Sequence, residues 1–427
     1  MRAAHIDAPR AKTLAAILAP DANSFGVIRL AMAVAVLFSH SFWFVTGSSA
    51  NEPLTAITGF SLGEHAVQVF FILSGVLVAQ SFDKSRSALD FAIARFLRIF
   101  PGLFVCVIAT ALALGLVVTV LAPQDFIAHP GLKTYLAKTL TLVSGSASLP
   151  GVFETLPVAG LFNGSLWTLK YEVICYAGLA VLGALGLFEP RLRGLAMAIV
   201  ALFAAGCAAL LPAGPHAGYA AGQNIAYFAI YFATGVFAYL IRERLVIHWM
   251  ASALLLALAA FAIGKPWQNI ATAVALGYAT LFFGSLTYGR LTKWTRAHDL
   301  SFGIYIYSAP IQQTLIQLYP GIDPYTVSAA GLLIAGLCAY VSWTWIEAPA
   351  LSWRRPLVSM FRPARQPVAA EPERLAEVIA AAAPPMPPAR FTGPDLNRRL
   401  GRAAPPARHA RGSLRVPPAQ SAARYRG

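Results

Sequence analysis

Ten stretches of this chain are apolar for about 20 residues each, the length that an α-helix needs to cross the hydrocarbon core of a membrane. Because that core offers the backbone no other hydrogen-bond partner, such segments cross it as helices. The composition agrees: 57% of the residues are hydrophobic and 12% are charged, about half the charged share of a soluble domain. We therefore predict an all-α, polytopic integral membrane protein with spans at 25–46, 62–82, 99–122, 165–187, 194–212, 223–241, 246–263, 268–287, 300–318 and 325–347.

The basic residues between these spans give an orientation. The N-terminal segment and every second connection hold 14 Lys and Arg residues, whereas the remaining connections hold three, with the C-terminal tail left out of the count. Basic residues collect on the cytoplasmic side of membrane proteins. This uneven distribution predicts that both termini are cytoplasmic. An odd number of spans would destroy the alternation of basic and non-basic connections.

The last 74 residues, 354–427, have a different composition. They hold 14 arginines, four acidic residues and 13 prolines, with no apolar periodicity. Such a segment cannot bury enough surface to fold, so we predict a disordered cytoplasmic tail that either contacts anionic lipids or is simply solvated. The predicted organisation is a cytoplasmic segment 1–24, a transmembrane domain 25–353 and this tail. Because most of the net charge of +15 lies in the tail, we expect membrane lipids as partners and no nucleic acid.

The first span contains two ionisable residues. Arg29 and His40 are eleven residues apart, which places them on one helix face and roughly 16 Å apart along the axis. Ionisable residues at membrane depth usually mark a reaction site or a pathway. The alternative is an arginine that reaches the membrane surface and a histidine that hydrogen-bonds a neighbouring helix, and the spacing leaves both readings open.

The fourth span contains a polar stripe at helical spacing, made by Thr168, Glu172 and Tyr176. We expect Glu172 to lie at the depth of His40, because each residue is a few turns from the outer end of its own span. A carboxylate beside an imidazole fixes its tautomer and raises its basicity, as a general base requires. The alternative is a structural ion pair of Glu172.

Arg95 and Arg98 are neighbours on one helix face just before Pro101. Two guanidinium groups that project together suit a phosphate-rich ligand, although the spacing alone favours anchoring to lipid headgroups. The four cysteines show no CxxC or metal-ligand spacing, so we expect neither a disulfide framework nor a metal. They are Cys106, Cys175, Cys207 and Cys338.

Six motifs follow one another along residues 25–350: Arg29-x10-His40, Phe70-Phe71-Ile-Leu-Ser74-Gly75, Arg95-x-x-Arg98-Ile-x-Pro101, Trp167-Thr-Leu-x-x-Glu172-x-x-x-Tyr176, Asp299-Leu-Ser301-x-Gly303-Ile-Tyr305 and Trp345-Ile-Glu347-x-Pro349. In this order they resemble the membrane acyltransferase-3 family. We expect no second, esterase-like domain in the tail, so an acyl transfer would be completed by the membrane part or by a separate partner.

The resemblance implies an O-acyltransferase of the inner membrane. Such enzymes move an acyl group, usually acetyl, from a cytoplasmic coenzyme A thioester to a hydroxyl of an envelope or secreted saccharide, such as an O-antigen or exopolysaccharide. The saccharide is either free or lipid-linked. Arg29 and His40 would correspond to the family's essential arginine and histidine, and Arg95 and Arg98 to its arginine pair.

We expect acyl-CoA (acetyl-CoA) as the donor, bound through its phosphates by the three arginines. His40 would remove the proton from the acceptor hydroxyl, and Glu172 would orient the imidazole. Residues predicted to bind the acceptor are Trp167, Tyr176 and Gln68.

Several alternatives stay open. A transporter or flippase for a lipid-linked anionic glycan would use the same arginines as a pathway and His40 with Glu172 as a proton relay. The connection 123–164 either faces the acceptor or is a re-entrant or amphipathic connector. We expect Ser74-Gly75 to serve helix packing, because no base is visible beside Ser74 in the sequence. Glu347 is expected to pair with Arg95 or Arg98.

Overall fold

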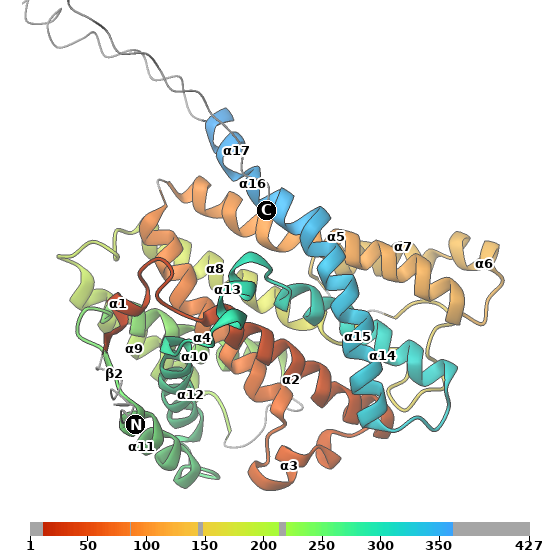
Figure 1. Ribbon diagram of the computed structural model, residues 1–427, viewed down its shortest axis with the longest axis horizontal. Helices are drawn as coiled ribbons and strands as arrows, with labels where there is room; N and C mark the ends of the chain where they lie inside the picture. The colour runs from red at the N-terminus through yellow and green to blue at the C-terminus, as the bar shows by residue number, and fades with distance from the viewer. Residues whose placement is uncertain (1–11, 86, 144–147, 213–218, 362–427) are drawn as a thin grey trace, which may run out of the picture. The chain divides into compact units, whose positions relative to one another are not determined.

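A computed structural model of the chain describes residues 12–85, 87–143, 148–212 and 219–361, and these residues form a bundle of helices (Figure 1). Two short strands, β1 (Lys12–Thr13) and β2 (Val246–Ile247), pair antiparallel. The helices are α1 (Leu14–Ile17), α2 (Phe25–Thr46), η1 (Ser49–Asn51), α3 (Pro53–Thr58), α4 (Leu62–Lys84), α5 (Ala88–Val118), α6 (Pro123–Ala128), α7 (Pro130–Leu140), η2 (Leu166–Thr168), α8 (Leu169–Ala184), α9 (Arg193–Ala209), α10 (Ala221–Leu240), α11 (Trp249–Phe261), α12 (Gln268–Ser285), α13 (Arg290–Ala297), α14 (Ser301–Leu318), α15 (Pro324–Ser342), the π-helical turn η3 (Trp343–Glu347), α16 (Ala348–Ser352) and α17 (Arg354–Met360).

Each of the ten predicted spans contains a helix, but the helices differ in their ability to cross a membrane. Five are long and apolar enough: α2, α4, α5, the segment Leu166–Ala184 and the segment Pro324–Met360. A sixth arises if α12 and α13, which meet at 105°, form one broken span. The prediction of a helical membrane protein is therefore confirmed. The count of ten spans stays a prediction, since α9 and α11 have only 17 and 13 residues. The cytoplasmic position of both termini also stays a prediction.

Two predicted boundaries are wrong. Helix α5 begins at Ala88 rather than at residue 99, and it continues through Pro101 as one helix of 31 residues. Residues 354–360, which we placed in a disordered tail, form α17, and Arg354 donates a 2.8 Å hydrogen bond to Asp90 of α5. An ion pair with a buried carboxylate thus extends the ordered chain. The rest of the predicted tail, like residues 1–11, lies outside the described residues.

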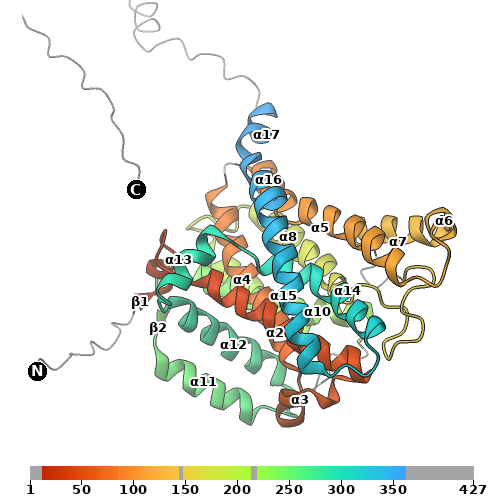
Figure 2. The same cartoon turned by 45° about the vertical axis from the view of Figure 1, so that its right-hand side comes forward.

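Large apolar side chains cover the outward faces of several helices. A soluble protein would bury most of such a surface, whereas lipid solvates it at no cost. Figure 2 shows α11 and α12 lying side by side along one side of the bundle, and α15 and α14 along another. The exposed set includes Phe96, Phe104, Val117, Leu202, Phe203, Leu254, Leu333, Leu337 and Trp345.

Helices α4 and α10 touch through two glycines. A Cβ atom on Gly75 would overlap the carbonyl oxygen of Phe232, and a Cβ on Gly235 would overlap that of Ile72. Without hydrophobic force between helices in lipid, small residues allow the close backbone approach that holds them together. The packing role predicted for Gly75 is confirmed.

We expect Gly75→Ala to lower the stability of the protein by about 1–3 kcal/mol, because the added methyl group forces the two backbones apart. The control is Gly178→Ala on α8, where a Cβ meets nothing within 4 Å. That variant should be neutral or stabilised by up to about 1 kcal/mol. Thermal unfolding of the detergent-solubilised protein measures both. Equal unfolding temperatures for the two variants would contradict the assigned contact.

Candidate functional site

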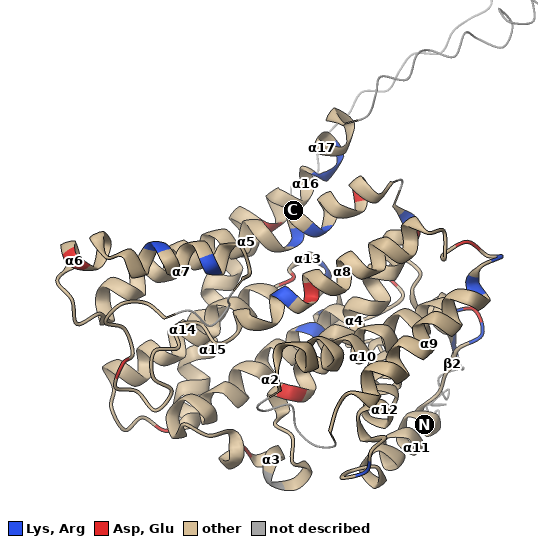
Figure 3. Cartoon of the chain, turned by 180° about the vertical axis from the view of Figure 1, so that it is seen from behind, with Lys and Arg blue, Asp and Glu red and all other residues tan. Residues whose placement is uncertain are grey.

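A pocket of about 110 Å³ lies between α2, α4, α5, α8 and α14. Its volume is well below the roughly 300–1,000 Å³ that encloses a drug-sized molecule, so in this state it holds only part of a large ligand. The long helices around it are mostly uncharged, with a few charged residues inside the bundle (Figure 3). The polar residues of its lining are Arg29, Ser74, Arg95, Arg98, Thr168, Glu172, Tyr176, Ser301 and Tyr305.

Asp299, just before α14, joins two of the three arginines. One of its carboxylate oxygens forms an ion pair with Arg29 at 3.0 Å and accepts a hydrogen bond from Arg98 at 2.7 Å, and the other accepts from Ser301 at 2.7 Å. Burial alone would raise the pKa of Asp299, but the two guanidinium groups outweigh it and hold the pKa at about 2. The carboxylate is therefore ionised at any physiological pH and ties α2, α5 and α14 together.

The three arginines differ in how far the protein neutralises them. Arg98 also pairs with Glu347 at 3.7 Å, which confirms one of the two partners predicted for that carboxylate. Arg95 has no carboxylate within 4 Å among the described residues; it donates to Ser81 at 3.4 Å and lies 5.8 Å from the ring centre of Tyr176.

Two of these guanidinium groups have unused hydrogen-bond donors. The Nε atoms of Arg29 and Arg95 are buried and lack a partner within the described part of the chain. A buried donor without an acceptor is costly, so an anionic ligand that supplied oxygen atoms here would be favoured. The structure thus brings together all three residues predicted to bind the donor.

Glu172 lies in the same pocket. One of its oxygens accepts from Ser74 at 3.2 Å and from the hydroxyl of Tyr176. The predicted stripe of Thr168, Glu172 and Tyr176 lines the pocket as expected. The interpretation of Ser74 as a packing residue is incomplete, because a carboxylate that is distant in sequence lies beside it.

The predicted pairing of His40 with Glu172 is wrong. A Cβ on Gly63 would lie 2.9 Å from the side chain of Ser39, whereas Arg29 lines the same pocket as Ser74 and Leu77. Helix α4 therefore runs antiparallel to α2, with Gly63 beside the residue before His40. Ser74 is eleven residues further along α4, about 16 Å away along the axis. Glu172, bonded to Ser74, therefore lies at the level of Arg29.

The loop that precedes α8 causes this displacement, because it is bonded along α14. The amide of Gln313 donates to the carbonyls of Val158 and Leu161 at 3.1 and 3.2 Å, and Asn163 donates to the carbonyl of Ile306 at 2.8 Å. The loop thus follows α14 inward for seven residues, about 10 Å. Buried amides replace the water that these carbonyls would otherwise need. Helix α8 consequently starts beside the middle of α14, and the alternatives for the connection 123–164 stay predictions.

The other predicted site residues lie outside the pocket lining. The ring of His40 packs against Trp43 and Phe44, and its Nδ1 atom is buried with no partner among the residues described. The Oε1 atom of Gln68 accepts from Nδ1 of His65 at 2.8 Å, and its Nε2 atom donates to the hydroxyl of Tyr227. Trp167 packs edge-on against Tyr171. The structure therefore does not gather the three residues predicted to bind the acceptor.

The comparisons with known proteins agree with the motifs. Residues 23–346 match the acyltransferase-3 family, described as an acyltransferase domain. The chain belongs to this family. The prediction of an O-acyltransferase is confirmed, and family membership decides against the transporter alternative.

Two relatives are similar over most of their length. Nodulation protein 10 of Rhizobium leguminosarum bv. viciae is 29% identical over 378 residues, which cover 79% of this chain and 95% of the relative. The O-acetyl transferase of Shigella phage Sf6 is 28% identical over 357 residues, covering 79% and 98%. No solved structure matches the chain.

Sequence reasoning missed the role of Asp299. It belongs to one of the six motifs, but its separation from Arg98 by 201 residues hides the contact. An acidic residue directly before an apolar span, in a chain with few acids, was the available signal. Ser74 was missed for the same reason, since its partner is 98 residues away.

We expect Asp299→Asn to cost about 3 kcal/mol of stability, because it leaves two partly buried guanidinium groups without their shared counter-ion. The control is Glu189→Gln, which removes the partner of Arg191 in an exposed ion pair and should cost at most about 1 kcal/mol. Unfolding temperatures in detergent report both.

The pH dependence provides a second readout of the same variant. Because the folded pKa of Asp299 lies at about 2, below the ordinary value of 3.8, its stabilisation is complete above the ordinary value and disappears as the pH falls towards 2. The deficit of Asp299→Asn should therefore shrink over that range. A constant deficit would argue against the ion pair as its cause.

Proposed function

We propose that this protein takes an acyl group, acetyl in the simplest case, from a coenzyme A thioester on the cytoplasmic side of the inner membrane and transfers it to a hydroxyl of an envelope or secreted saccharide. One observation carries the proposal: three arginines line the same pocket, and two of them, Arg29 and Arg95, keep a buried Nε donor without a partner among the described residues. The phage relative is named an O-acetyl transferase, which supports acetyl as the transferred group.

The arginines suit the phosphates of the donor. Guanidinium groups bind phosphate through two parallel hydrogen bonds, which a lone ammonium cannot do. Asp299 fixes Arg29 and Arg98 side by side, and Arg95, which has no carboxylate near it in the described structure, offers its charge to the ligand. The phosphates would therefore bind at the end of the pocket where α2 and α5 approach α14.

His40 suits the transfer step at the other end. It lies on the same helix as Arg29, eleven residues further on, about 16 Å along the axis. The pantetheine arm of coenzyme A is long enough to cover such a distance. The arm would pass Glu172, whose carboxylate can accept hydrogen bonds from the amide groups of the arm, and place the thioester near His40. The imidazole would remove the proton from the acceptor hydroxyl.

His40→Ala should lower kcat by about 100-fold or more, the usual contribution of a general base, and leave the donor KM unchanged because the residue lies far from the arginines. The assay follows thiol release from acetyl-CoA by the purified protein, together with the mass of the saccharide product. Full acylation by the variant would remove His40 from the mechanism.

Arg95→Lys should raise the donor KM by about tenfold or more, since it loses a charge-assisted, two-pronged contact with phosphate. The kcat at saturating donor should be preserved. Arg191→Lys is the matched control, because Arg191 is 84% exposed and pairs only with Glu189 among the described residues. A variant with an unchanged KM would place the donor phosphates elsewhere.

A further inference from the structure

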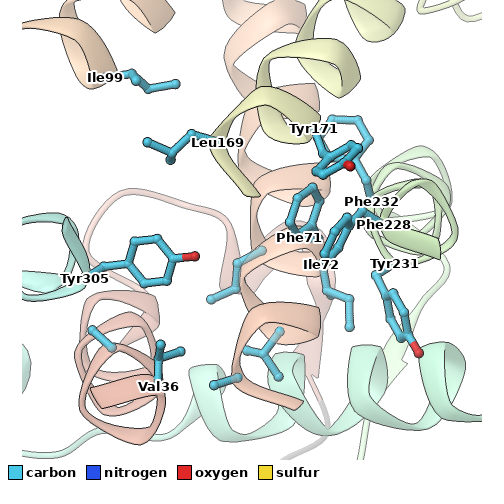
Figure 4. Packing of buried hydrophobic residues seen from close by; sticks show 14 of the residues in the cluster. Val36, Phe71, Ile72, Ile99, Leu169, Tyr171, Phe228, Tyr231, Phe232 and Tyr305 are labelled. Carbon is cyan, nitrogen blue, oxygen red and sulfur yellow. The ribbon is translucent and has the colours of Figure 1, made fainter. Parts of the chain in front are cut away.

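The lining of the pocket contains a pair of hydroxyl groups that bond to each other. Thr168 on η2 and Tyr305 on α14 share a hydrogen bond of 2.6 Å, and both residues are buried, at 5% and 8% exposure. The ring of Phe70 meets that of Tyr305 edge-on at 5.8 Å. Figure 4 shows Tyr305 projecting from α14 towards α4, with Leu169 and Ile99 nearby.

This pair lies between the arginines and His40. Helices α2 and α14 run parallel, because Asp299 contacts Arg29 near their first turns while Gln312 donates to the carbonyl of Leu37 and the hydroxyl of Ser41 at 2.7 and 2.6 Å. Tyr305 comes seven residues before Gln312, so about 10 Å separates it along the axis from the level of His40.

The pair retains one hydroxyl hydrogen that the described structure does not use. Two hydroxyl groups carry two hydrogens, and the single bond between them uses one. The other uncharged hydroxyl donors of the pocket lining differ, since Ser74 and Tyr176 both donate to Glu172 and Ser301 donates to Asp299. Among the described residues that line the pocket, the hydroxyl hydrogen free to bind a substrate is therefore on Thr168 or Tyr305.

The distance to His40 fits an acyl transfer. A hydrogen bond from the acceptor hydroxyl to the imidazole takes about 3 Å, and the attacked carbonyl carbon lies about 3–3.5 Å from that hydroxyl. A hydrogen bond from the carbonyl oxygen to Tyr305 takes about 3 Å more. Together these contacts cover a length similar to the roughly 10 Å that separates the two levels along the helix axis.

We propose that Tyr305 is a catalytic residue that donates a hydrogen bond to the thioester carbonyl oxygen, and that Thr168 is a positioning residue that accepts or donates the bond orienting the Tyr305 hydroxyl. This inference rests on the proposed function. The acceptor oxygen attacks the carbonyl carbon, its proton passes to His40, and the negative charge that forms on the carbonyl oxygen is stabilised by Tyr305. When the carbonyl re-forms, the carbon–sulfur bond breaks and the thiolate takes the proton from His40.

The test uses the purified full-length protein with acetyl-CoA and a saccharide acceptor that the wild type acetylates. Tyr305→Phe should lower kcat about 100-fold, the usual effect of removing one such donor, with the donor KM within twofold of wild type and the unfolding temperature lowered by only the few degrees that the loss of one buried hydrogen bond costs. Tyr307→Phe is the control, because this tyrosine is on the same helix and buried but lies outside the pocket lining. It should keep the wild-type kcat.

Thr168 provides the second arm of the test. Thr168→Val should lower kcat several-fold, and Thr168→Ser, which restores the hydroxyl, should recover it. Wild-type kcat in Tyr305→Phe, or equal rates for Thr168→Val and Thr168→Ser, would overturn the inference. A wild-type protein that consumes no acyl thioester would instead refute the proposed function, so the two failures are distinguishable.

Discussion

The carboxylate of Asp299 between Arg29 and Arg98 is the contact on which the rest of the site depends. In a membrane-embedded bundle, two guanidinium groups at one end of a pocket repel each other and are costly to bury unless a counter-ion lies between them. Asp299 supplies that charge and joins α2, α5 and the start of α14. Because those helices form three walls of the pocket, the same ion pairs that stabilise the bundle also fix the positions of the groups proposed to bind phosphate.

From this end the polar groups follow a line through an otherwise apolar interior. Glu172 with Ser74 lies at the level of the arginines, the pair of Thr168 and Tyr305 comes next, and His40 lies beyond it. Along the helix axis, each of these groups is separated from the next by about two turns of helix or less. A long, flexible donor with phosphates at one end and a thioester at the other matches this order. A proton relay would instead need ionisable groups that contact one another. Glu172 and His40 do not contact each other.

The sequence predicted the positions of the helices along the chain better than the contacts between the helices. Apolar length located all ten helical segments, and the spacing of Thr168, Glu172 and Tyr176 placed their side chains on one face, because both follow from local geometry. The depth of Glu172 was not predicted correctly. We estimated the depth of Glu172 by assuming that the chain enters the membrane as a helix, and the loop held by Gln313 and Asn163 breaks that assumption.

Contacts between distant segments could not be predicted from one sequence. The pairing of Asp299 with Arg98 and of Ser74 with Glu172 depends on the helix register, which close glycine contacts such as that of Gly75 with Gly235 determine. No periodicity encodes that register. The ordered motifs nevertheless identified the arginines and His40 as a set, although they did not reveal that His40 and Glu172 are apart.

The central claim is that one donor molecule lies along this line, and a structure of the purified protein with a non-hydrolysable analogue of acetyl-CoA tests it most directly. We predict density for the phosphates against Arg29, Arg95 and Arg98, with the arm beside Glu172 and the acyl carbonyl between Tyr305 and His40. Phosphates bound at any other surface, or an arm that points away from His40, would contradict the account.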